Sequence, residues 1–435
     1  MQKMKQKRYG FASWKVTGTA KTRRAAPRSS EGRRKGRAAE FAAIASIPLV
    51  LVLGNSMLIP VLPQMQKELG ISPFQSSLTI TLFSVTAGLF IPVLGYLSDR
   101  FSRKAIIIPS LIVYGGAGIL AGFGAIWDSY AVVIAARALQ GLGAAGTAPI
   151  AMALVGDMYE GGTESRALGL TEASNGTGKV LSPILGSLLA LIVWYAAFFA
   201  FPVFCLVSLM CVLFILKEPE RKKEAPRLGR YIRTIARILK ARGRWLITAF
   251  VVGSLALFTL FGVLVYLSDM LEKAPYRIDG VMKGLVLAVP LLGMVATSYT
   301  TGGFIRKNGI LIRRLMNIGL ALAAAALALT IWFNKNIYVF IGLLTLSSIG
   351  TGLVLPCLNT MITGAVSKGE RGMITSLYSS LRFLGVAFGP PLISRLTAAS
   401  SDNDTAVFLT VTALAVLSFL LVFFLIKPGR QLHES

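Results

Sequence analysis

The chain has 435 residues, of which 54% are hydrophobic and 15% are charged, and its mean hydropathy is +0.67. This composition excludes a set of soluble domains and indicates an integral membrane protein. The formal net charge of +26 would also suit nucleic-acid binding. We attribute it to membrane orientation instead, because most of the Lys and Arg residues lie in segments predicted to be cytoplasmic.

Residues 1–39 are rich in Lys, Arg, Gly, Ser and Ala, and this composition predicts a basic, disordered cytoplasmic tail. Apolar segments follow, each long enough to cross about 30 Å of hydrocarbon as a helix. We predict twelve of them, at roughly 40–62, 75–97, 105–127, 129–156, 166–190, 192–216, 244–268, 280–303, 312–333, 336–364, 370–394 and 405–426. The predicted fold class is therefore all-α integral membrane, a multi-pass protein of the cell membrane with both termini in the cytoplasm.

The second half of the sequence repeats Gly and Pro positions of the first half at an offset of 207 residues. Gly143 corresponds in this way to Gly350. Such a repeat predicts two six-helix bundles, at 40–216 and 244–426, related by a pseudo-twofold axis along the membrane normal.

Residues 217–243 separate the two predicted bundles and form a cytoplasmic linker. Within it, apolar residues recur at helical spacing and basic residues occupy the other faces. This pattern predicts a basic amphipathic helix, which either lies on the inner leaflet or packs beneath the bundles. Residues 427–435 form the C-terminal cytoplasmic tail.

Ionised side chains lie within three of the predicted spans, where an unpaired charge costs about 3 kcal/mol. Glu172, Asn175 and Lys179 lie at i, i+3 and i+7 of segment 166–190 and therefore line one face. We interpret Glu172 as a group that takes up and releases a proton, with Lys179 or the substrate biasing its protonation. The alternative is a permanent salt bridge that holds this segment to a neighbouring helix.

Arg137 and Gln140 share a face of segment 129–156, and Arg382 lies within segment 370–394. Each arginine needs an acceptor, which is a carboxylate, a backbone carbonyl or an anionic substrate. A tie between helices and a substrate contact both remain open.

The predicted substrate cavity mixes polar, charged and aromatic side chains, which suits an amphiphilic organic compound. For its aromatic members, packing in the helical core is an equal alternative. The predicted cavity residues are Asn55, Gln140, Asn175, Lys179, Tyr266, Tyr378 and Arg382.

No cofactor or metal site is predicted. The stretch Asn175–Val180 superficially resembles a phosphate-binding loop, but it lacks the leading Gly and a preceding strand. The three Cys residues lie in apolar spans, and His433 is the only histidine. The chain is therefore not predicted to be an enzyme, and an ion gradient or the substrate's own gradient is the expected source of energy.

Residues 95–104, GYLSDRFSRK, resemble the signature loop of the major facilitator superfamily, with Ser in place of its second Gly. Residues 54–63 resemble the first-helix motif of its twelve-helix drug/proton antiporter branch. Residues 137–143 resemble the superfamily's fourth-helix motif, whose Arg is implicated in proton transfer. The resemblance implies a transporter that works by alternating access with an inner gate. The residues assigned to the gate are Gly95, Asp99, Arg100, Arg103 and Asp157.

The fifth predicted span resembles the antiporter motif of that branch, with Ser in place of one Gly, and the eleventh span repeats the core of the motif. Gly and Pro at these positions would act as bends and close-packing points that let the two bundles rock. The predicted helix-bend residues are Gly178, Pro183, Gly385, Gly389 and Pro390.

The predicted function is that of a proton-coupled antiporter that exports an amphiphilic organic compound or drug, with Glu172 and Arg137 in proton coupling. The expected partners are a small-molecule substrate, protons and the lipid bilayer, without nucleic acid, and the chain is expected to act as a monomer. Three alternatives remain open. They are an exporter or flippase of an anionic metabolite such as a siderophore or lipid-linked headgroup, a proton-coupled nutrient importer, and a membrane-anchored nucleic-acid binder.

Overall fold

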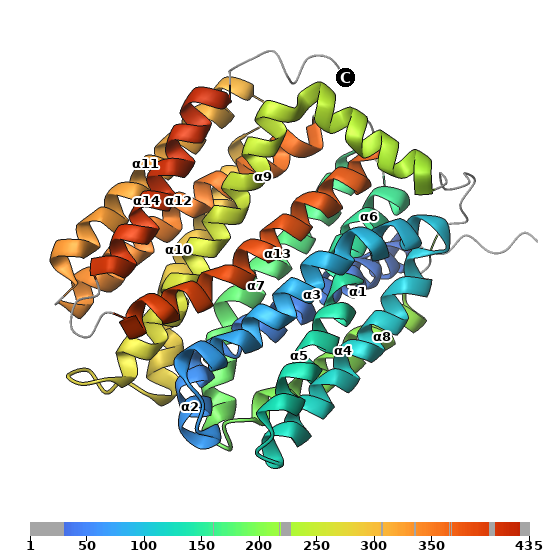
Figure 1. Cartoon of the computed structure of the whole chain (residues 1–435). Helices are drawn as coiled ribbons and strands as arrows, with labels where there is room; N and C mark the ends of the chain where they lie inside the picture. Colours follow the sequence, from blue (N-terminus) through green and yellow to red (C-terminus); the bar gives the residue numbers. More distant parts are fainter. Residues whose placement is uncertain are drawn as a thin grey trace, which may run out of the picture. The chain divides into compact units, whose positions relative to one another are not determined.

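Figure 1 shows the computed structural model of the chain, which describes residues 30–159, 161–216, 218, 228–305, 308–334, 336–364, 366, 368–399 and 405–426. The compact unit comprises Ala39–Ser435, and Met1–Ala38 form a separate unit. Residues 1–29 of the predicted basic tail, all of the predicted tail 427–435 and residues 219–227 of the predicted linker lie outside the described residues.

All of the regular structure in the described residues is helical. In chain order the helices are α1 Ser30–Ser56, the 3₁₀ turn η1 Ile59–Val61, α2 Leu62–Leu69, α3 Pro73–Arg100, α4 Arg103–Ile126, α5 Tyr130–Ala145, α6 Ala148–Met158, α7 Gly161–Ala190, α8 Ala196–Phe214, α9 Leu228–Glu272, α10 Gly280–Phe304, α11 Gly309–Phe333, α12 Ile337–Gly364, α13 Lys368–Ala399 and α14 Thr405–Leu425.

Three helix boundaries differ from the sequence prediction. The first predicted span is divided, because α1 ends at Ser56 and a 3₁₀ turn containing Pro60 precedes α2. The fourth span is divided between α5 and α6, with Pro149 in the first turn of α6, where the missing N–H of proline costs no intrahelical hydrogen bond. The predicted border at 243/244 is not a helix end, since α9 is continuous for 45 residues.

Ten helical segments are long and apolar enough to cross a membrane by length and composition. The long helices α7 and α13, of 30 and 32 residues, are not among these ten. Helix α7 carries Glu172 and Lys179, and helix α13 carries Arg382. These charged residues, together with Asn, Ser and Thr, lower the hydropathy of the two helices.

The helices of the compact unit pack in two groups. In the first, α4 lies against α5 and α8, and α3 lies against α5. In the second, α12 lies against α10 and α11, α11 against α14, and α9 against α13. The groups meet where α3 packs along α13 and α7 packs along α10, and Figure 1 shows α3 and α13 side by side.

The 207-residue repeat is visible in the helix bounds. Pro73 and Gly280, the first residues of α3 and α10, are 207 residues apart, and so are Gly161 and Lys368, which begin α7 and α13. The element order of the second group therefore follows that of the first.

Glycines allow close approaches of the backbone in both groups of helices. A Cβ atom on Gly186 of α7 would collide with the carbonyl of Met57 beside α1. A Cβ atom on Gly389 of α13 would collide in the same way with the carbonyl of Phe258 in α9. Removing the side chain lets the two backbones touch, which is how small residues promote helix packing in membranes.

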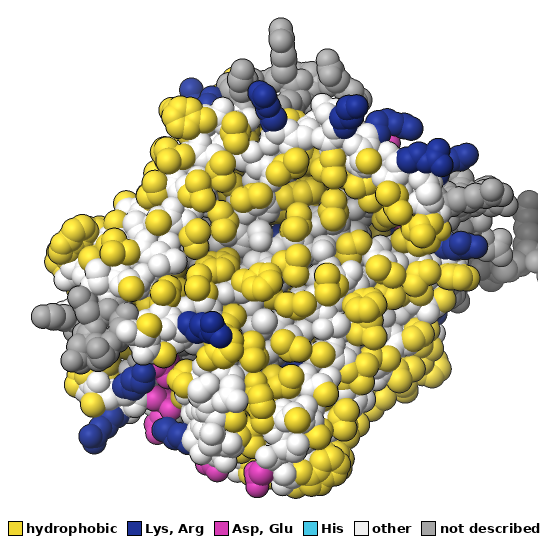
Figure 2. Space-filling model, viewed as in Figure 1, with side chains coloured by type: hydrophobic (Ala, Val, Ile, Leu, Met, Phe, Trp, Pro, Cys, Tyr) yellow, Lys and Arg dark blue, Asp and Glu magenta, His cyan; other side chains and the backbone are white. Residues whose placement is uncertain are grey.

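Large apolar side chains cover much of the surface drawn in Figure 2, between ends where charged residues gather. On α4 and α8, for example, Ile112 is 57% exposed and Leu206 is 58% exposed. Continuous apolar surface of this kind is unfavourable in water and is suited to contact with lipid.

Candidate functional site

The polar face predicted for the fifth span lies on α7, and its side chains become more buried toward the C-terminal end of the helix. Glu172 is exposed, Asn175 and Lys179 are half-buried, and Ser182 is fully buried. The Ser182 hydroxyl donates a hydrogen bond to the carbonyl of Gly178 one turn earlier. The two ionisable groups of the face, Glu172 and Lys179, are therefore not fully enclosed by the packing of the helices.

Residues of α13 complete this site. Lys179 interacts electrostatically with Arg382 and with Glu172, and Tyr378 interacts with the same two residues. The guanidinium carbon of Arg382 lies 5.4 Å from the centroid of the Tyr378 ring. The structure therefore brings together four predicted residues from two helices that are about 200 positions apart, consistent with the offset noted above.

Two hydrogen-bond donors at this site lack an acceptor. Within the described residues, Arg382 Nε and the Tyr378 hydroxyl are buried without a hydrogen-bond partner. The Tyr378 ring is held by stacking on Phe250 of α9 at a centroid distance of 5.7 Å. A buried donor without a partner is costly, so a ligand or water that accepts from these groups would be stabilised here.

Arg137 and Gln140 lie elsewhere, in the interface between α5 and α3. Both are fully buried, and Arg137 Nη1 donates to the Gln140 side-chain oxygen. Arg137 Nε donates to the carbonyl of Thr79 at 2.9 Å, and its guanidinium lies 4.4 Å from the centroid of the Phe83 ring. These contacts favour the alternative in which Arg137 ties helices together.

The other two predicted cavity residues are Tyr266 and Asn55. Tyr266 is 6% exposed and its ring packs edge-on against Phe340 and Phe408, at centroid distances of 6.1 and 5.3 Å. This cluster of rings favours core packing over cavity lining for Tyr266. The side chain of Asn55 lies outside the part of the chain that is described.

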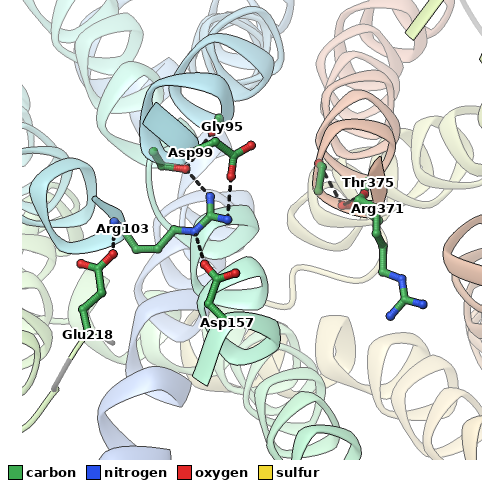
Figure 3. A network of polar contacts seen from close by, with 9 residues as sticks. Gly95, Asp99, Arg103, Asp157, Glu218, Arg371 and Thr375 are labelled. Carbon is green, nitrogen blue, oxygen red and sulfur yellow. Dashed lines mark hydrogen bonds and ion pairs between the residues drawn. The ribbon is translucent and has the colours of Figure 1, made fainter. Parts of the chain in front are cut away.

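The predicted gate residues meet around Arg103, which is 6% exposed (Figure 3). Its guanidinium lies 2.7 Å from Asp99 Oδ1 and 2.9 Å from Asp157 Oδ2, and it donates to Ser98 Oγ at 2.6 Å. Asp99 lies in the last turn of α3, Arg103 begins α4 and Asp157 lies in the last turn of α6, so one buried cation joins three helix ends. We call Ser98, Asp99, Arg103, Asp157 and Glu218 the Arg103 cluster.

Glu218 belongs to this cluster but was not singled out from the sequence. Its carboxylate accepts from the backbone N–H groups of Arg103 and Lys104 at 2.7 and 3.0 Å, at the N-terminus of α4. The Ser102 hydroxyl accepts from the third, Ala105 N–H, at 2.9 Å. An acidic group is favourable at a helix N-terminus, and Lys104 Nζ in return donates to the Leu216 carbonyl beyond α8. The sequence signal that could have identified Glu218 is the presence of an acidic residue directly after an apolar span.

The other two predicted gate residues lie beside the cluster. Arg100 is exposed. Gly95 faces α13, and a Cβ atom there would lie 2.9 Å from Ser376 Oγ. Gly95 therefore marks the place where α3 and α13 approach closely at this end of the bundle.

The helix-bend residues lie inside continuous helices, since α7 runs through Pro183 and α13 runs through Pro390. A Cβ atom on Gly178 would lie 3.0 Å from the Leu49 side chain of α1, and one on Gly385 would collide with Ser254 of α9. These are close-packing positions, and their action as bends stays a prediction.

A second ion cluster lies near the opposite end of α3, and nothing in the sequence pattern predicted it. Glu272 Oε1 accepts from Lys283 Nζ at 2.6 Å, and Glu272 Oε2 lies 3.4 Å from Lys67 Nζ. The side chain of Lys283 is only 2% exposed, whereas that of Lys67 is 74% exposed. We call these three residues the Glu272 cluster.

Comparisons with known proteins agree with this geometry. A family model described as Major Facilitator Superfamily matches residues 44–309 and 263–435. The chain is 43% identical over 397 residues to a bacillibactin exporter of Bacillus subtilis, an alignment that covers 90% of this chain and 98% of that protein. It is 29% identical to the multidrug efflux protein YfmO of the same organism, over 82% of this chain and 85% of that protein.

The fold is also similar to a solved structure. The human organic anion transporter MFSD10 (TETRAN) superposes with a TM-score of 0.69 at 20% sequence identity, covering 89% of this chain and 99% of that one. The helical architecture, the signature loop around Arg103 and the family match lead to one conclusion: the chain belongs to the major facilitator superfamily, whose members are membrane transporters of small molecules and not enzymes.

Proposed function

We propose that the protein is a twelve-helix transporter of the cell membrane, in which α7 and α13 cross the bilayer beside the ten more apolar spans. Both helices exceed the roughly 20 residues needed to cross the hydrocarbon core. On α7, Glu172 lies within electrostatic range of Lys179, and attraction between these opposite charges lowers the cost of holding them at membrane depth. The groups α1–α8 and α9–α14 form two bundles related by a pseudo-twofold axis, and the 207-residue offset of the helix starts supports this.

The end that carries the Arg103 cluster faces the cytoplasm, as do both termini. Support comes from the distribution of charge, because Lys and Arg gather along this end in Figure 2 and cytoplasmic loops are enriched in them. The two bundles rock about the site between α7 and α13, which opens in turn to each side of the membrane.

The substrate is an anionic organic compound that the protein exports. One observation carries this proposal: within the described residues the buried donors of Arg382 and Tyr378 lack acceptors, and the cationic Lys179 lies within electrostatic range of Arg382. Two cations against the single carboxylate of Glu172 leave the site with an excess of positive charge. An anion that accepts from these groups gains charge-assisted hydrogen bonds.

The relative with 43% identity supports this choice, because its name assigns it the export of bacillibactin. A siderophore or another anionic metabolite is therefore the substrate class that we favour. A second candidate is an amphiphilic or cationic drug, which the exposed carboxylate of Glu172 could attract. The 29% identical relative, named as a multidrug efflux protein, supports that candidate.

Replacing Lys179 separates the two candidates. An anion exporter in proteoliposomes is expected to lose most of its bacillibactin transport in Lys179→Ala and to retain it in Lys179→Arg, which keeps the charge. A cationic-dye exporter is expected to keep or gain ethidium transport in Lys179→Ala, since a repelling charge is removed. Unchanged bacillibactin transport in Lys179→Ala would remove Lys179 from the anion site.

Export is coupled to proton entry through Glu172, which is exposed and lies within electrostatic range of Lys179. Glu172 protonates from outside, the substrate leaves outward, and release of the proton to the inside resets the site. Arg137, fixed between α3 and α5, modulates this step by holding the helices around it.

The coupling is tested by substrate-driven proton flux, recorded with a pH-sensitive dye inside proteoliposomes. Glu172→Gln cannot ionise and is expected to abolish the flux, while Glu172→Asp retains it in part. Equal proton flux in wild type and Glu172→Gln would exclude this residue from coupling. The proposal that the substrate is an anion would be unaffected by that result.

A further inference from the structure

The first turns of α9 form a helical limb, Leu228–Arg244, that precedes the apolar part of the same helix. In Figure 1 this limb, in yellow-green, runs across one end of the bundle before the helix turns into it. The sequence left open whether this segment lies on a membrane or packs beneath the bundle. One face of the limb packs on the bundle, and its other faces are exposed, so the two alternatives are considered face by face.

One face of the limb packs on the bundle. Tyr231 is 5% exposed and Ile238 is 8% exposed. The Tyr231 ring meets Tyr96 of α3 edge-on at a centroid distance of 5.0 Å, and both belong to an apolar cluster with Met373 of α13. Because the limb touches α3 and α13, its rotation about its own axis is fixed, and so is the direction of its other faces.

A second face is a line of cations. The intervals of three and four residues between its members keep them on one side of a helix. All five are exposed, and among the residues that the structure describes no ion pair joins them to a carboxylate. We call them the basic stripe: Arg230, Arg233, Arg237, Lys240 and Arg244. Figure 2 shows dark-blue side chains along the end of the molecule over which α9 runs.

A third face, between the packed face and the basic stripe, is apolar and open. Leu228 is 53% exposed and Ile232 is 57% exposed. Ala236 continues this line and is exposed as well. Large apolar side chains therefore lie exposed beside the cations, on a side of the helix that differs from the packed face.

We propose that the basic stripe and the apolar line beside it bind the anionic headgroups of the membrane leaflet at this end of the bundle. Cations attract the phosphates, while Leu228 and Ile232 enter the boundary between headgroups and acyl chains. A soluble polyanion would use the cations but would leave the apolar line in water. The proposal depends on the placement of α9 and not on the transported substrate or on proton coupling.

The test measures lipid affinity of the full-length protein in detergent by native mass spectrometry. Phosphatidylglycerol and phosphatidylcholine with the same acyl chains are titrated separately, and a fluorescent single-stranded oligonucleotide is titrated alongside by anisotropy. The altered chain carries Arg230→Gln, Arg233→Gln, Arg237→Gln and Lys240→Gln. Each basic residue near an anionic surface contributes about fivefold in affinity, so phosphatidylglycerol should bind at least about tenfold more weakly, with phosphatidylcholine unchanged.

Two controls decide what a loss means. The charge-preserving variant Arg230→Lys, Arg233→Lys and Arg237→Lys should keep the preference for phosphatidylglycerol, and raising the salt concentration should weaken it. A second variant, with Arg23→Gln, Arg24→Gln, Arg33→Gln and Arg34→Gln, removes four cations from outside the limb and should leave most of the preference intact.

Three outcomes would overturn the proposal. They are an unchanged preference in the stripe variant, a loss of the same size in the variant at 23, 24, 33 and 34, and a stripe variant that loses only oligonucleotide binding. The last would identify the limb as a surface for soluble polyanions. Thermal unfolding of each variant is measured in parallel, and retention of the wild-type unfolding temperature excludes misfolding as the cause of a loss.

Discussion

The Arg103 cluster and the Glu272 cluster lie at opposite ends of the helices, and they differ in what they connect. Arg103 contacts Asp99, Asp157 and Ser98, all of which belong to the helices α1–α8. The Glu272 cluster instead joins α9 and α10 to Lys67 of α2. One set of ion pairs stiffens a single group of helices, while the other links the two groups.

This difference bears on how the two groups could move. Separation of the groups at the end that carries the Arg103 cluster would leave the contacts of Arg103 with Ser98, Asp99 and Asp157 in place, because all three lie within α1–α8. What crosses there is the approach of Gly95 to Ser376 and the packing of Tyr96 on Tyr231. Separation at the other end must break the contact between Lys67 and Glu272. The ion pairs of Arg103 thus position helix ends within one group. The contacts of Gly95 with Ser376 and of Tyr96 with Tyr231 join the two groups at this end.

The largest effect is expected from Arg103→Ala. This change removes the buried guanidinium that lies between the carboxylates of Asp99 and Asp157. Loss of one partner from a buried ion pair costs about 3 kcal/mol in the free energy of unfolding. The measurement is thermal or denaturant unfolding in detergent.

The exposed neighbour Arg100→Ala is the control for this prediction, and it is expected to change the unfolding free energy by less than about 0.5 kcal/mol. Equal effects of the two changes would show that Arg103 does not hold the helix ends together.

An intermediate effect is expected from Glu272→Gln. It deprives the buried ammonium of Lys283 of its carboxylate, and we expect a loss of about 2 kcal/mol in the free energy of unfolding. The double variant Glu272→Gln with Lys283→Met removes the stranded charge and is expected to recover part of this loss. A double variant that is less stable than Glu272→Gln alone would contradict the assignment of the cost to the unpaired lysine.

The smallest effect is expected from Lys67→Ala. Its ammonium is largely exposed and 3.4 Å from Glu272, so solvent and salt screen the pair, and stability should change by less than about 0.5 kcal/mol. The change should appear instead in the balance between the two states in which the site opens to one or the other side of the membrane. This balance is measured as the rate of thiol labelling of a cysteine introduced by Leu271→Cys or at a neighbouring buried position. Labelling identical to that of the parent Cys variant would show that the pair does not help to hold this end closed.

The sequence alone determined the helical class, most of the apolar spans, the 207-residue repeat and the meeting of Asp99 with Arg103. Each of these follows from local properties: hydropathy over about 20 residues, the 3.6-residue period, and a motif whose members lie close together in the chain. The charged face of α7 was predictable for the same reason, because Glu172 and Lys179 lie two turns apart on one helix.

Only the tertiary structure decided the partners that are distant in sequence. It placed Glu218 on the N-terminus of α4, buried Arg137 against the carbonyl of Thr79, and set Arg382 beside Lys179. It also moved Tyr266 into a cluster of rings. Periodicity fixes which side of a helix a residue occupies, but the neighbour it meets there depends on how the helices pack, and that is a property of the whole assembly of spans.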